Sequence, residues 1–306
     1  MLSVIEALLP VFGIVIIGFI FKRNRFPGEN FWPQADKLTY FVLFPALIIE
    51  KLSNAQLQRP DIIPMVLILI FVILVVSMTV SIIMFLLKED AMFFTSVIQG
   101  SIRPNTYVGL AAAVAVYGQE GLAIAAVAIS GVIPLVNIIS VFAFVRMIPN
   151  GGKTNAKAVL INILKNPLII ACIIGLLLNF TRLGLPYTTR SVFEIIGRAA
   201  LPMGLMSVGA GLILHELATI LKAIVLSSVF KLLILPLSVM FIFDFFEIDG
   251  LTKWVAVMYA SLPCSVSSYT LASQMGGDTE MVAGIITVQT LIAMVSMTLI
   301  LSFSGI

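Results

Sequence analysis

Two stretches of this chain place a proline among polar side chains inside otherwise apolar sequence. The first is Gly100–Gly109, with the letters GSIRPNTYVG, and the second is Ala260–Tyr269, with the letters ASLPCSVSSY. A proline inside a helix removes one N–H donor and clashes with the preceding turn. In an apolar environment the freed backbone groups must find other partners. Each stretch therefore predicts an interrupted helix with hydroxyl and amide side chains at the break.

Arg103 is the residue of the first stretch that favours a specific chemistry. It lies deep inside the apolar run 91–117, with no acidic residue close to it in sequence. A charge at such a depth costs about 2.5–3.5 kcal/mol on insertion scales, so the side chain should face a cavity or a partner. A guanidinium group binds a carboxylate through two parallel hydrogen bonds. We expect Arg103 to anchor a carboxylate; a structural ion pair and an orientation toward the membrane edge are the alternatives.

The two breaks together define the candidate binding site. Inverted-repeat transporters place their site at paired broken helices, where helix N-termini favour an anionic group. The alternative is a pair of ordinary proline kinks padded with serine. The candidate substrate-binding residues are Arg103, Pro104, Asn105, Thr106, Tyr107, Pro263, Cys264, Ser265, Ser267 and Ser268. The candidate hinge residues are Pro45, Pro104, Pro202 and Pro263.

The composition indicates what surrounds these breaks. Of 306 residues, 60% are hydrophobic and 11% are charged, whereas a soluble domain carries about 25% charged residues. A spanning helix needs about 20 apolar residues, so the fold class is an all-α membrane protein with ten transmembrane helices. The expected helices are 3–21, 37–52, 62–87, 91–117, 121–147, 158–180, 188–213, 218–243, 252–274 and 279–304.

The two halves of the chain resemble each other in the spacing of proline and glycine. Pro10, Gly18 and Pro45 recur 157 residues later as Pro167, Gly175 and Pro202, and Pro104 recurs 159 residues later as Pro263. We expect a first five-helix repeat in 1–148, a cytoplasmic linker in 149–157 and a second repeat in 158–306. Because five is odd, the second repeat must enter the bilayer inverted, as in many secondary transporters.

The orientation follows from the lysine and arginine residues, which favour the cytoplasmic side. With the N-terminus outside, ten fall inside and five outside, so we expect an inner-membrane protein with both termini in the periplasm. The inside residues are Lys22, Arg23, Arg25, Lys37, Lys88, Arg146, Lys153, Lys157, Lys165 and Lys222. The outside residues are Lys51, Arg59, Arg182, Arg190 and Lys253.

Several classes of function are excluded. The basic residues form no stripe with interleaved aromatics, so no nucleic acid is expected. One histidine, His215, and two cysteines in apolar runs, Cys172 and Cys264, predict neither a metal site nor a disulfide framework. A phosphate-binding glycine–lysine loop and a nucleophile–base pair are both missing. We therefore expect no cofactor and no enzymatic activity.

Other polar residues inside the apolar runs have less specific interpretations. Glu194 and Arg198 are spaced to pair on one helix face. Lys231 is expected to be structural, with a role at a cavity as the alternative. Asn137 and Gln289 could line a path or form hydrogen bonds between helices.

These motifs, in this order and spacing, resemble the auxin efflux carrier family, including its bacterial malonate and malate permease-like members. The residues that carry the resemblance are Arg103–Gly109 with Tyr117–Gly118, Asn166–Pro167 with Gly175, Leu201–Gly204, and Leu262–Tyr269 with Leu271–Ala272 and Gly276–Asp278. The long cytoplasmic loop of the plant carriers is missing, since residues 148–157 form only a short linker.

The resemblance implies a fold similar to bile-acid sodium symporters and sodium/proton antiporters. Counting the ten expected helices in chain order, it implies a scaffold of helices 1, 2, 6 and 7 that also mediates a homodimer. It also implies a transport bundle of helices 3–5 and 8–10. Broken helices 4 and 9 cross at the site, where the asparagine that matches Asn105 meets the substrate carboxylate. The paired membrane aspartates of the antiporters are missing from this sequence, so coupling to sodium or protons through such groups is not expected.

The sequence thus predicts a secondary transporter or facilitator that moves small organic anions across the inner membrane by alternating access. The resemblance implies a dicarboxylate such as malonate or malate. The partners expected are a small carboxylate, the lipid bilayer and a second copy of the chain. The alternatives are an exporter of neutral or amino-acid-derived solutes and a membrane receptor that transports nothing.

Overall fold

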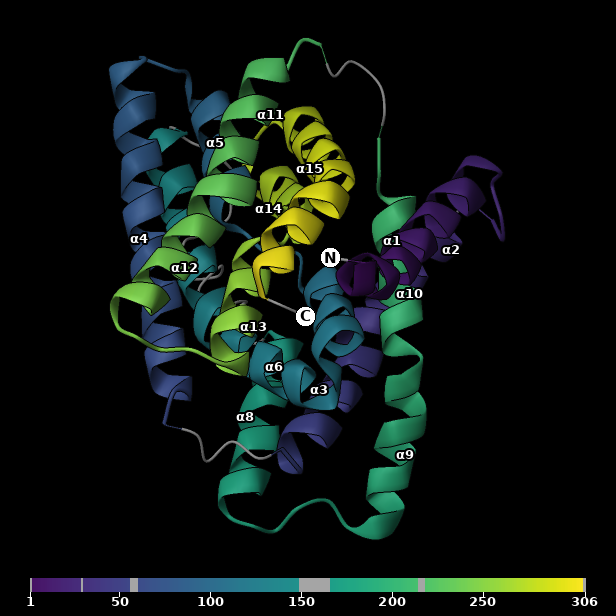
Figure 1. Ribbon diagram of the computed structural model, residues 1–306. Coiled ribbons are helices and arrows are strands. Elements are labelled where there is room, and N and C mark those ends of the chain that lie inside the picture. Colours follow the sequence, from purple (N-terminus) through teal and green to yellow (C-terminus); the bar gives the residue numbers. More distant parts are fainter. Residues whose placement is uncertain (1, 29, 56–59, 149–165, 214–217, 305–306) are drawn as a thin grey trace.

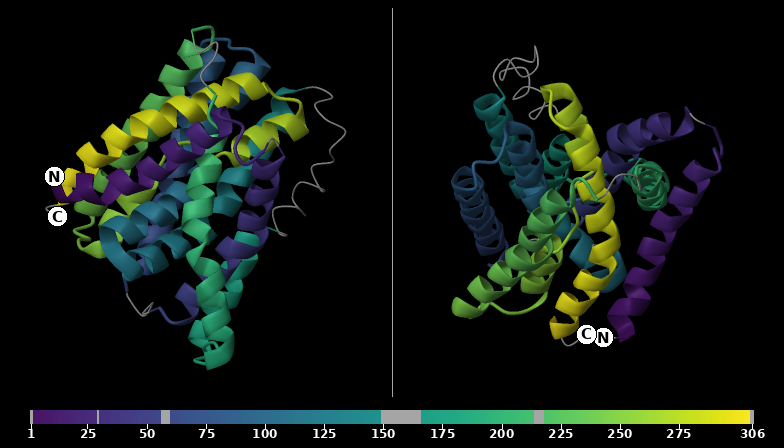
Figure 2. Two further views of the ribbon diagram at one scale, coloured as in Figure 1. Left: turned by 90° about the vertical axis from the view of Figure 1, so that its right-hand side faces the viewer. Right: turned by 90° about the horizontal axis from the view of Figure 1, so that it is seen from above.

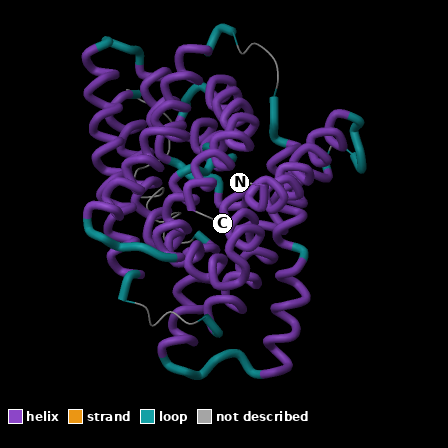
Figure 3. Tube along the Cα trace, in the orientation of Figure 1, coloured by secondary structure: helices purple, strands orange, loops and turns teal. Residues whose placement is uncertain are grey.

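The computed structural model describes residues 2–28, 30–55, 60–148, 166–213 and 218–304. Within these ranges the secondary structure is helical, without a strand, and short loops join the helices (Figure 3). Six helical segments are long and apolar enough to cross a membrane, and two shorter apolar helices accompany them. The expected class, an all-helical membrane protein, is thereby supported. The expected linker 149–157, residues 158–165 and His215 lie outside the described residues.

The first part of the chain forms helices that end and begin near the expected residues. The helices are α1 (Leu2–Arg23), α2 (Phe31–Leu38), the π-helical turn η1 (Thr39–Leu43), α3 (Phe44–Ser53), α4 (Ile62–Leu86), α5 (Ala91–Ile102) and α6 (Thr106–Met147). α6 has 42 residues but contains a kink at Gly118, where φ is 66°. Glycine accepts this conformation without a steric penalty. The kink falls between the expected helices 91–117 and 121–147.

The second part of the chain is also helical where it is described. Its helices are α8 (Pro167–Phe180), α9 (Tyr187–Arg198), α10 (Ala200–Ala210), α11 (Leu221–Ser228), the π-helical turn η2 (Val229–Ile234), α12 (Leu235–Phe245), α13 (Leu251–Ala260), α14 (Ser267–Met275), α15 (Thr279–Leu301) and the 3-10 turn η3 (Ser302–Ser304). The chain is thus interrupted at both expected prolines, between α5 and α6 and between α13 and α14.

The helix expected at 37–52 begins earlier, at Phe31, so the expected start was wrong. Its first turns are amphipathic and mix aromatic with polar residues. Hydropathy alone misses such a start because it registers only the apolar stretch that follows. The π-helical turn η1 then leads into α3, where Pro45 occupies the first turn. Proline needs no N–H partner in a first turn. Pro202 has a similar place, since it follows the short interruption at Ala199 between α9 and α10.

α1 and α10 pack closely because glycines line their contact. A Cβ atom on Gly18 would lie 2.1 Å from the carbonyl oxygen of Met206, and one on Gly209 would lie 1.8 Å from that of Val15. Small residues of this kind let the backbones of membrane helices approach each other.

The remaining helices fall into two neighbourhoods. α3 packs against α8 and α9, close to the α1–α10 pair. On the other side, α4, α5 and α6 pack with α11, α12 and α13. Figures 1 and 2 place α4 at one edge of the molecule and α1 with α10 at the opposite edge. The two ends of the chain lie side by side (Figure 2), and the two interrupted segments meet in the middle.

Candidate functional site

The two interrupted segments are joined to each other by backbone hydrogen bonds. The N–H of Asn105 donates to the carbonyl of Pro263 at 2.8 Å, and the N–H of Ser265 donates to the carbonyl of Arg103 at 3.1 Å. The pairing is antiparallel and centres on Pro104 and Cys264. The candidate binding residues from the two halves of the sequence are therefore brought together where the interrupted segments cross.

Gln289 on α15 satisfies the backbone groups that the breaks set free. Pro104 has no N–H to donate to the carbonyl of Gly100, and Nε2 of Gln289 donates to this carbonyl at 3.1 Å instead. Oε1 of Gln289 accepts from the N–H of Cys264 at 2.9 Å. The side chain has no solvent exposure. Of the two interpretations that the sequence offers for Gln289, the structural one thus fits these contacts.

Lys231 provides a third substitute bond at the crossing. In an unbroken helix the carbonyl of Ala260 would accept from the N–H of Cys264, which is already taken by Gln289. Nζ of Lys231 donates to this carbonyl at 2.9 Å, and the lysine is 1% exposed. Lys231 lies in the π-helical turn η2, and π-helical turns are frequent at functional sites.

Asn105 ends the break and starts α6. Its Oδ1 accepts from the N–H groups of Tyr107 and Val108 at 3.1 and 3.2 Å, which is a typical N-terminal cap. Its Nδ2 has no partner although the residue is only 2% exposed. A buried amide with an open donor is costly unless something accepts from it, so the Nδ2 group is available to a bound molecule.

Arg103 is the charged residue of the crossing, and it is only 6% exposed. Its Nη2 donates to Oγ of Ser267 at 3.0 Å, while Nε and Nη1 have no partner. Ser267 in turn shares a hydrogen bond of 2.8 Å with Ser265. In the described part of the chain no carboxylate forms an ion pair with Arg103. The side chain therefore keeps the N–H groups of Nε and Nη1 free for an anionic ligand.

A cavity of about 650 Å³ lies beside the crossing. Seven of the ten candidate residues line it, namely Arg103, Pro104, Asn105, Thr106, Tyr107, Ser265 and Ser267. The other three, Pro263, Cys264 and Ser268, are buried outside the lining, and Sγ of Cys264 contacts Oγ of Ser268 at 3.4 Å. These three act on the site through the backbone of the crossing and not through contact with the cavity.

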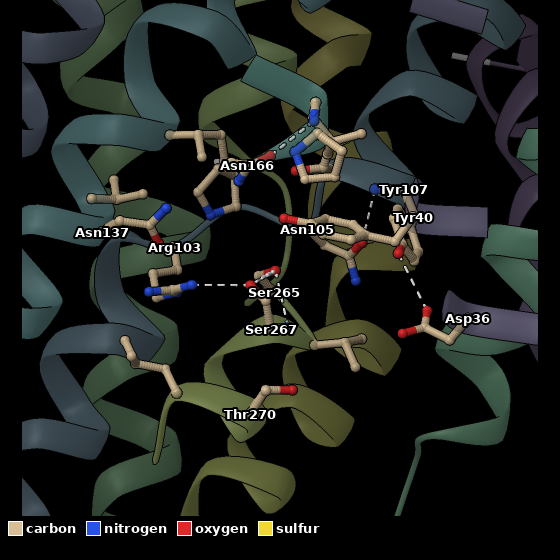
Figure 4. A pocket seen from close by; sticks show the side chains of 18 of the residues that line it. Asp36, Tyr40, Arg103, Asn105, Tyr107, Asn137, Asn166, Ser265, Ser267 and Thr270 are labelled. Carbon is tan, nitrogen blue, oxygen red and sulfur yellow. Dashed lines mark hydrogen bonds between the residues drawn. The ribbon is translucent and has the colours of Figure 1, made fainter. Parts of the chain in front are cut away.

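The cavity also contains residues that were not among the candidates. Polar groups come from Asp36, Tyr40, Asn137, Asn166, Thr270 and Gln274, and apolar walls come from Phe41, Ile133, Val136, Val141, Leu168, Val266 and Leu271. Figure 4 shows Arg103 and Asp36 on opposite sides of the cavity, with Ser265 and Asn105 between them. Asp36 and Tyr40 are four residues apart on one helical face, which is the signal that could have identified them.

Tyr107 connects the crossing to the helix that carries Asp36. Its hydroxyl donates to Oδ1 of Asp36 at 3.2 Å, and its ring stacks on Phe44 with the centroids 4.6 Å apart. Phe44 begins α3 and Asp36 lies on α2, whereas Tyr107 lies at the start of α6. The site is therefore assembled between two groups of helices.

The other charged pairs lie away from the cavity lining. Glu194 and Arg198 pair at 2.7 Å, as their spacing predicts. Lys253 pairs with Asp244 at 2.7 Å. These cations have carboxylate partners in the described part of the chain, in contrast to Arg103.

Comparisons with known proteins agree with a membrane function for this arrangement. The profile of a family described as membrane transport protein matches residues 3–301. An uncharacterized transporter of Methanocaldococcus jannaschii is 22% identical over 294 residues, which covers 93% of this chain and 94% of the relative. An uncharacterized transporter of Methanothermobacter thermautotrophicus is also 22% identical, over 297 residues, and the match covers 96% of each chain.

Proposed function

Because the chain belongs to the membrane transport protein family, we propose that it carries small ionised carboxylic acids across the membrane by alternating access. As a member of this family it is a transporter and not an enzyme. The single observation that carries the proposal is Arg103, a buried guanidinium with two unpartnered nitrogen atoms, Nε and Nη1, at a cavity. Guanidinium binds carboxylate in a two-pronged fashion, and the open Nδ2 group of Asn105 adds a further donor.

The proposed architecture is ten transmembrane helices in two inverted five-helix repeats, 1–148 and 158–306. It is supported by the two interrupted segments, one in each half, which meet in antiparallel orientation at Pro104 and Cys264. The kink at Gly118, which divides a helix of 42 residues, supports two spans in place of one. The two ends of the chain lie on the same side of the molecule (Figure 2), as an even number of spans requires.

The proposed architecture divides the ten expected spans into two parts. The first, second, sixth and seventh spans form a scaffold, and the third to fifth and eighth to tenth spans form a transport bundle that moves against it. The packing of α1 on α10 and of α3 on α8 and α9 supports the scaffold. The packing of α4, α5 and α6 with α11, α12 and α13 supports the bundle. A homodimer through the scaffold helices is part of the proposal, and cross-linking of exposed scaffold positions in membranes tests it.

The proposed location is the inner membrane, with both termini in the periplasm. In that orientation α2 and the start of α8, which contribute Asp36 and Leu168 to the cavity, lie on the cytoplasmic side. The cavity then opens toward the cytoplasm, and movement of the bundle would carry the crossing to the other side. Labelling of single cysteines from either face of sealed vesicles tests this orientation.

The resemblance favours a dicarboxylate such as malonate or malate as the substrate. The second candidate is an amino-acid-derived solute, which is favoured by the acidic side chain of Asp36 in the cavity. Two further alternatives fit the site less well. A neutral solute would leave the free N–H groups of Arg103 without an anionic partner. A receptor that transports nothing would give these groups no role in uptake.

Uptake into proteoliposomes tests the proposed function. A panel of radiolabelled carboxylates is offered to the wild type, to Arg103→Gln and to Arg146→Gln, whose arginine is exposed and outside the cavity lining. Removing one partner of a desolvated charge pair costs about 2–5 kcal/mol. We expect Arg103→Gln to reduce uptake at least about 30-fold, which corresponds to the lower of these values. Equal uptake by wild type and Arg103→Gln would contradict the proposal.

A further inference from the structure

The cavity has two charged residues of opposite sign in its described lining, Arg103 and Asp36. In the proposed function, on which the present inference rests, Arg103 receives a substrate carboxylate. The far end of the same substrate then lies near Asp36. The charge of Asp36 therefore determines which chemical groups are accepted there.

Asp36 has acceptor capacity left over. The residue is half-buried on α2, and its side chain accepts one hydrogen bond, from the hydroxyl of Tyr107 to Oδ1 at 3.2 Å. An ionised carboxylate has about four acceptor positions on its two oxygens. In the described part of the chain no lysine or arginine forms an ion pair with Asp36. The carboxylate therefore faces the cavity with an unneutralised charge.

The two charges do not neutralise each other. No ion pair joins Arg103 and Asp36, and Figure 4 shows them on opposite sides of the cavity. The side chains of Asn105 and Ser265 lie between them in this view. Apolar walls such as Phe41, Val136 and Leu271 complete the lining. The cavity is thus positive at one end, negative at the other and partly apolar in between.

We infer that the substrate is an amino-carboxylate, whose carboxylate binds Arg103, whose amino group binds Asp36 and whose carbon chain spans the apolar walls. A protonated amino group donates three hydrogen bonds and supplies the positive partner that the Asp36 carboxylate lacks. Such a zwitterion neutralises both ends of the cavity at once. The complementary placement of charges determines which partner is accepted.

A dicarboxylate is disfavoured by the same geometry. Its second carboxylate would lie beside Asp36, and two carboxylates that share a site cannot both remain ionised without cost. A repulsive group of this kind provides specificity by rejecting the competing ligand. The site therefore selects an amino-carboxylate over the dicarboxylate of equal length, and Asp36 is its specificity-determining residue.

Matched ligands that differ in one end group test the inference. For chains of three to eight carbons, the purified protein is titrated with the ω-amino acid, the α,ω-dicarboxylate and the simple monocarboxylate, and binding is measured by calorimetry. We expect the ω-amino acid to bind at least about tenfold more tightly than the dicarboxylate at the best chain length. Equal or tighter binding of the dicarboxylate overturns the inference.

Two variants show whether Asp36 produces the preference. In Asp36→Asn we expect the tenfold preference to disappear or reverse, because the amide no longer repels a second carboxylate. Asp36→Glu should retain the preference. Glu280→Gln, which removes an exposed charge outside the cavity lining, should behave as the wild type does.

The outcomes separate this inference from the proposed function. Carboxylate binding that depends on Arg103 but keeps its ligand preference in Asp36→Asn overturns the role of Asp36 and leaves the proposed function intact. If no ligand of any series binds to the wild type, both the substrate class and the role of Arg103 are wrong.

Discussion

The side-chain amide of Gln289 donates to the carbonyl of Gly100 at 3.1 Å, across 189 residues of sequence. This carbonyl is the group that Pro104 leaves without its helical donor. The same amide accepts from the N–H of Cys264 at 2.9 Å. One side chain on α15 thus supplies hydrogen-bond partners to both interrupted segments and fixes their relative position.

Replacing Gln289 with leucine should therefore destabilise the crossing. Two buried backbone groups lose their partners, and each unsatisfied group costs about 1–3 kcal/mol. We expect a clear loss of thermal stability in detergent, measured by tryptophan fluorescence or by size-exclusion chromatography after heating. Gln34→Leu is the matched control, because Gln34 is exposed on α2 and lies outside the cavity lining. A Gln289→Leu melting temperature equal to that of the wild type would show that the bonds contribute nothing.

Lys231 is expected to support carboxylate binding without touching the ligand. Its Nζ donates to the carbonyl of Ala260 just before the break at Pro263, so the lysine positions the backbone that leads to Ser265. Lys231→Met should weaken carboxylate affinity by roughly two- to tenfold, less than Arg103→Gln does. Titration calorimetry of both variants provides the comparison. An unchanged affinity in Lys231→Met would show that the lysine has no role in ligand binding beyond its hydrogen bond to the carbonyl of Ala260.

The hydrogen bond between Tyr107 and Asp36 should favour the present conformation. It links α6 of the proposed bundle to α2 of the proposed scaffold, and a neutral donor to a charged acceptor is worth about 1.5–3 kcal/mol. Tyr107→Phe keeps the stacking on Phe44 but loses this bond. We therefore expect this substitution to shift the population away from the present conformation.

Cysteine labelling measures this shift. Thr270 is exposed and lines the cavity, and both native cysteines are buried. A Thr270→Cys reporter should react more slowly with a membrane-impermeant maleimide after Tyr107→Phe. Tyr269→Phe, which alters an exposed tyrosine outside the cavity lining, is the control. The same reaction rate in both variants would rule out a role of the Tyr107 bond in the conformational balance.

The two glycine positions Gly209 and Gly13 should respond oppositely to alanine. A Cβ atom on Gly209 would meet the carbonyl of Val15 at 1.8 Å, whereas nothing lies within 4 Å of a Cβ atom on Gly13. Gly209→Ala must push α1 and α10 apart, at a cost of about 1–3 kcal/mol. Gly13→Ala should be neutral or stabilising by up to about 1 kcal/mol, because alanine favours a helix. Thermal unfolding in detergent measures the stability of both variants. Equal changes in melting temperature would contradict the close packing of α1 on α10.

The sequence was most informative where local chemistry determines the structure. Pro104 and Pro263 predicted both interruptions because a proline cannot continue a helix in lipid without help from other residues. Glu194 and Arg198 predicted their own ion pair because they are one helical turn apart. Arg103 stood out because a charge in an apolar run requires a reason.

The partners of these residues could not be predicted because they depend on tertiary contacts. Nothing local links Gln289 to Gly100, and polar side chains in membrane helices are equally compatible with packing or with a path. Asp36 was missed because its helix begins with amphipathic turns that hydropathy does not register. Cys264 and Ser268 were placed at the site because they border Pro263, whereas the structure turns them away from the cavity.

The most direct test is a cryo-electron microscopy map of the protein with its carboxylate substrate bound. One carboxylate oxygen should lie within hydrogen-bond distance, roughly 3 Å, of Nε or Nη1 of Arg103, and the other should lie at the same distance from Nη2. A map in which Arg103 pairs with an acidic side chain of the protein, while the substrate binds elsewhere, would contradict carboxylate binding at the crossing.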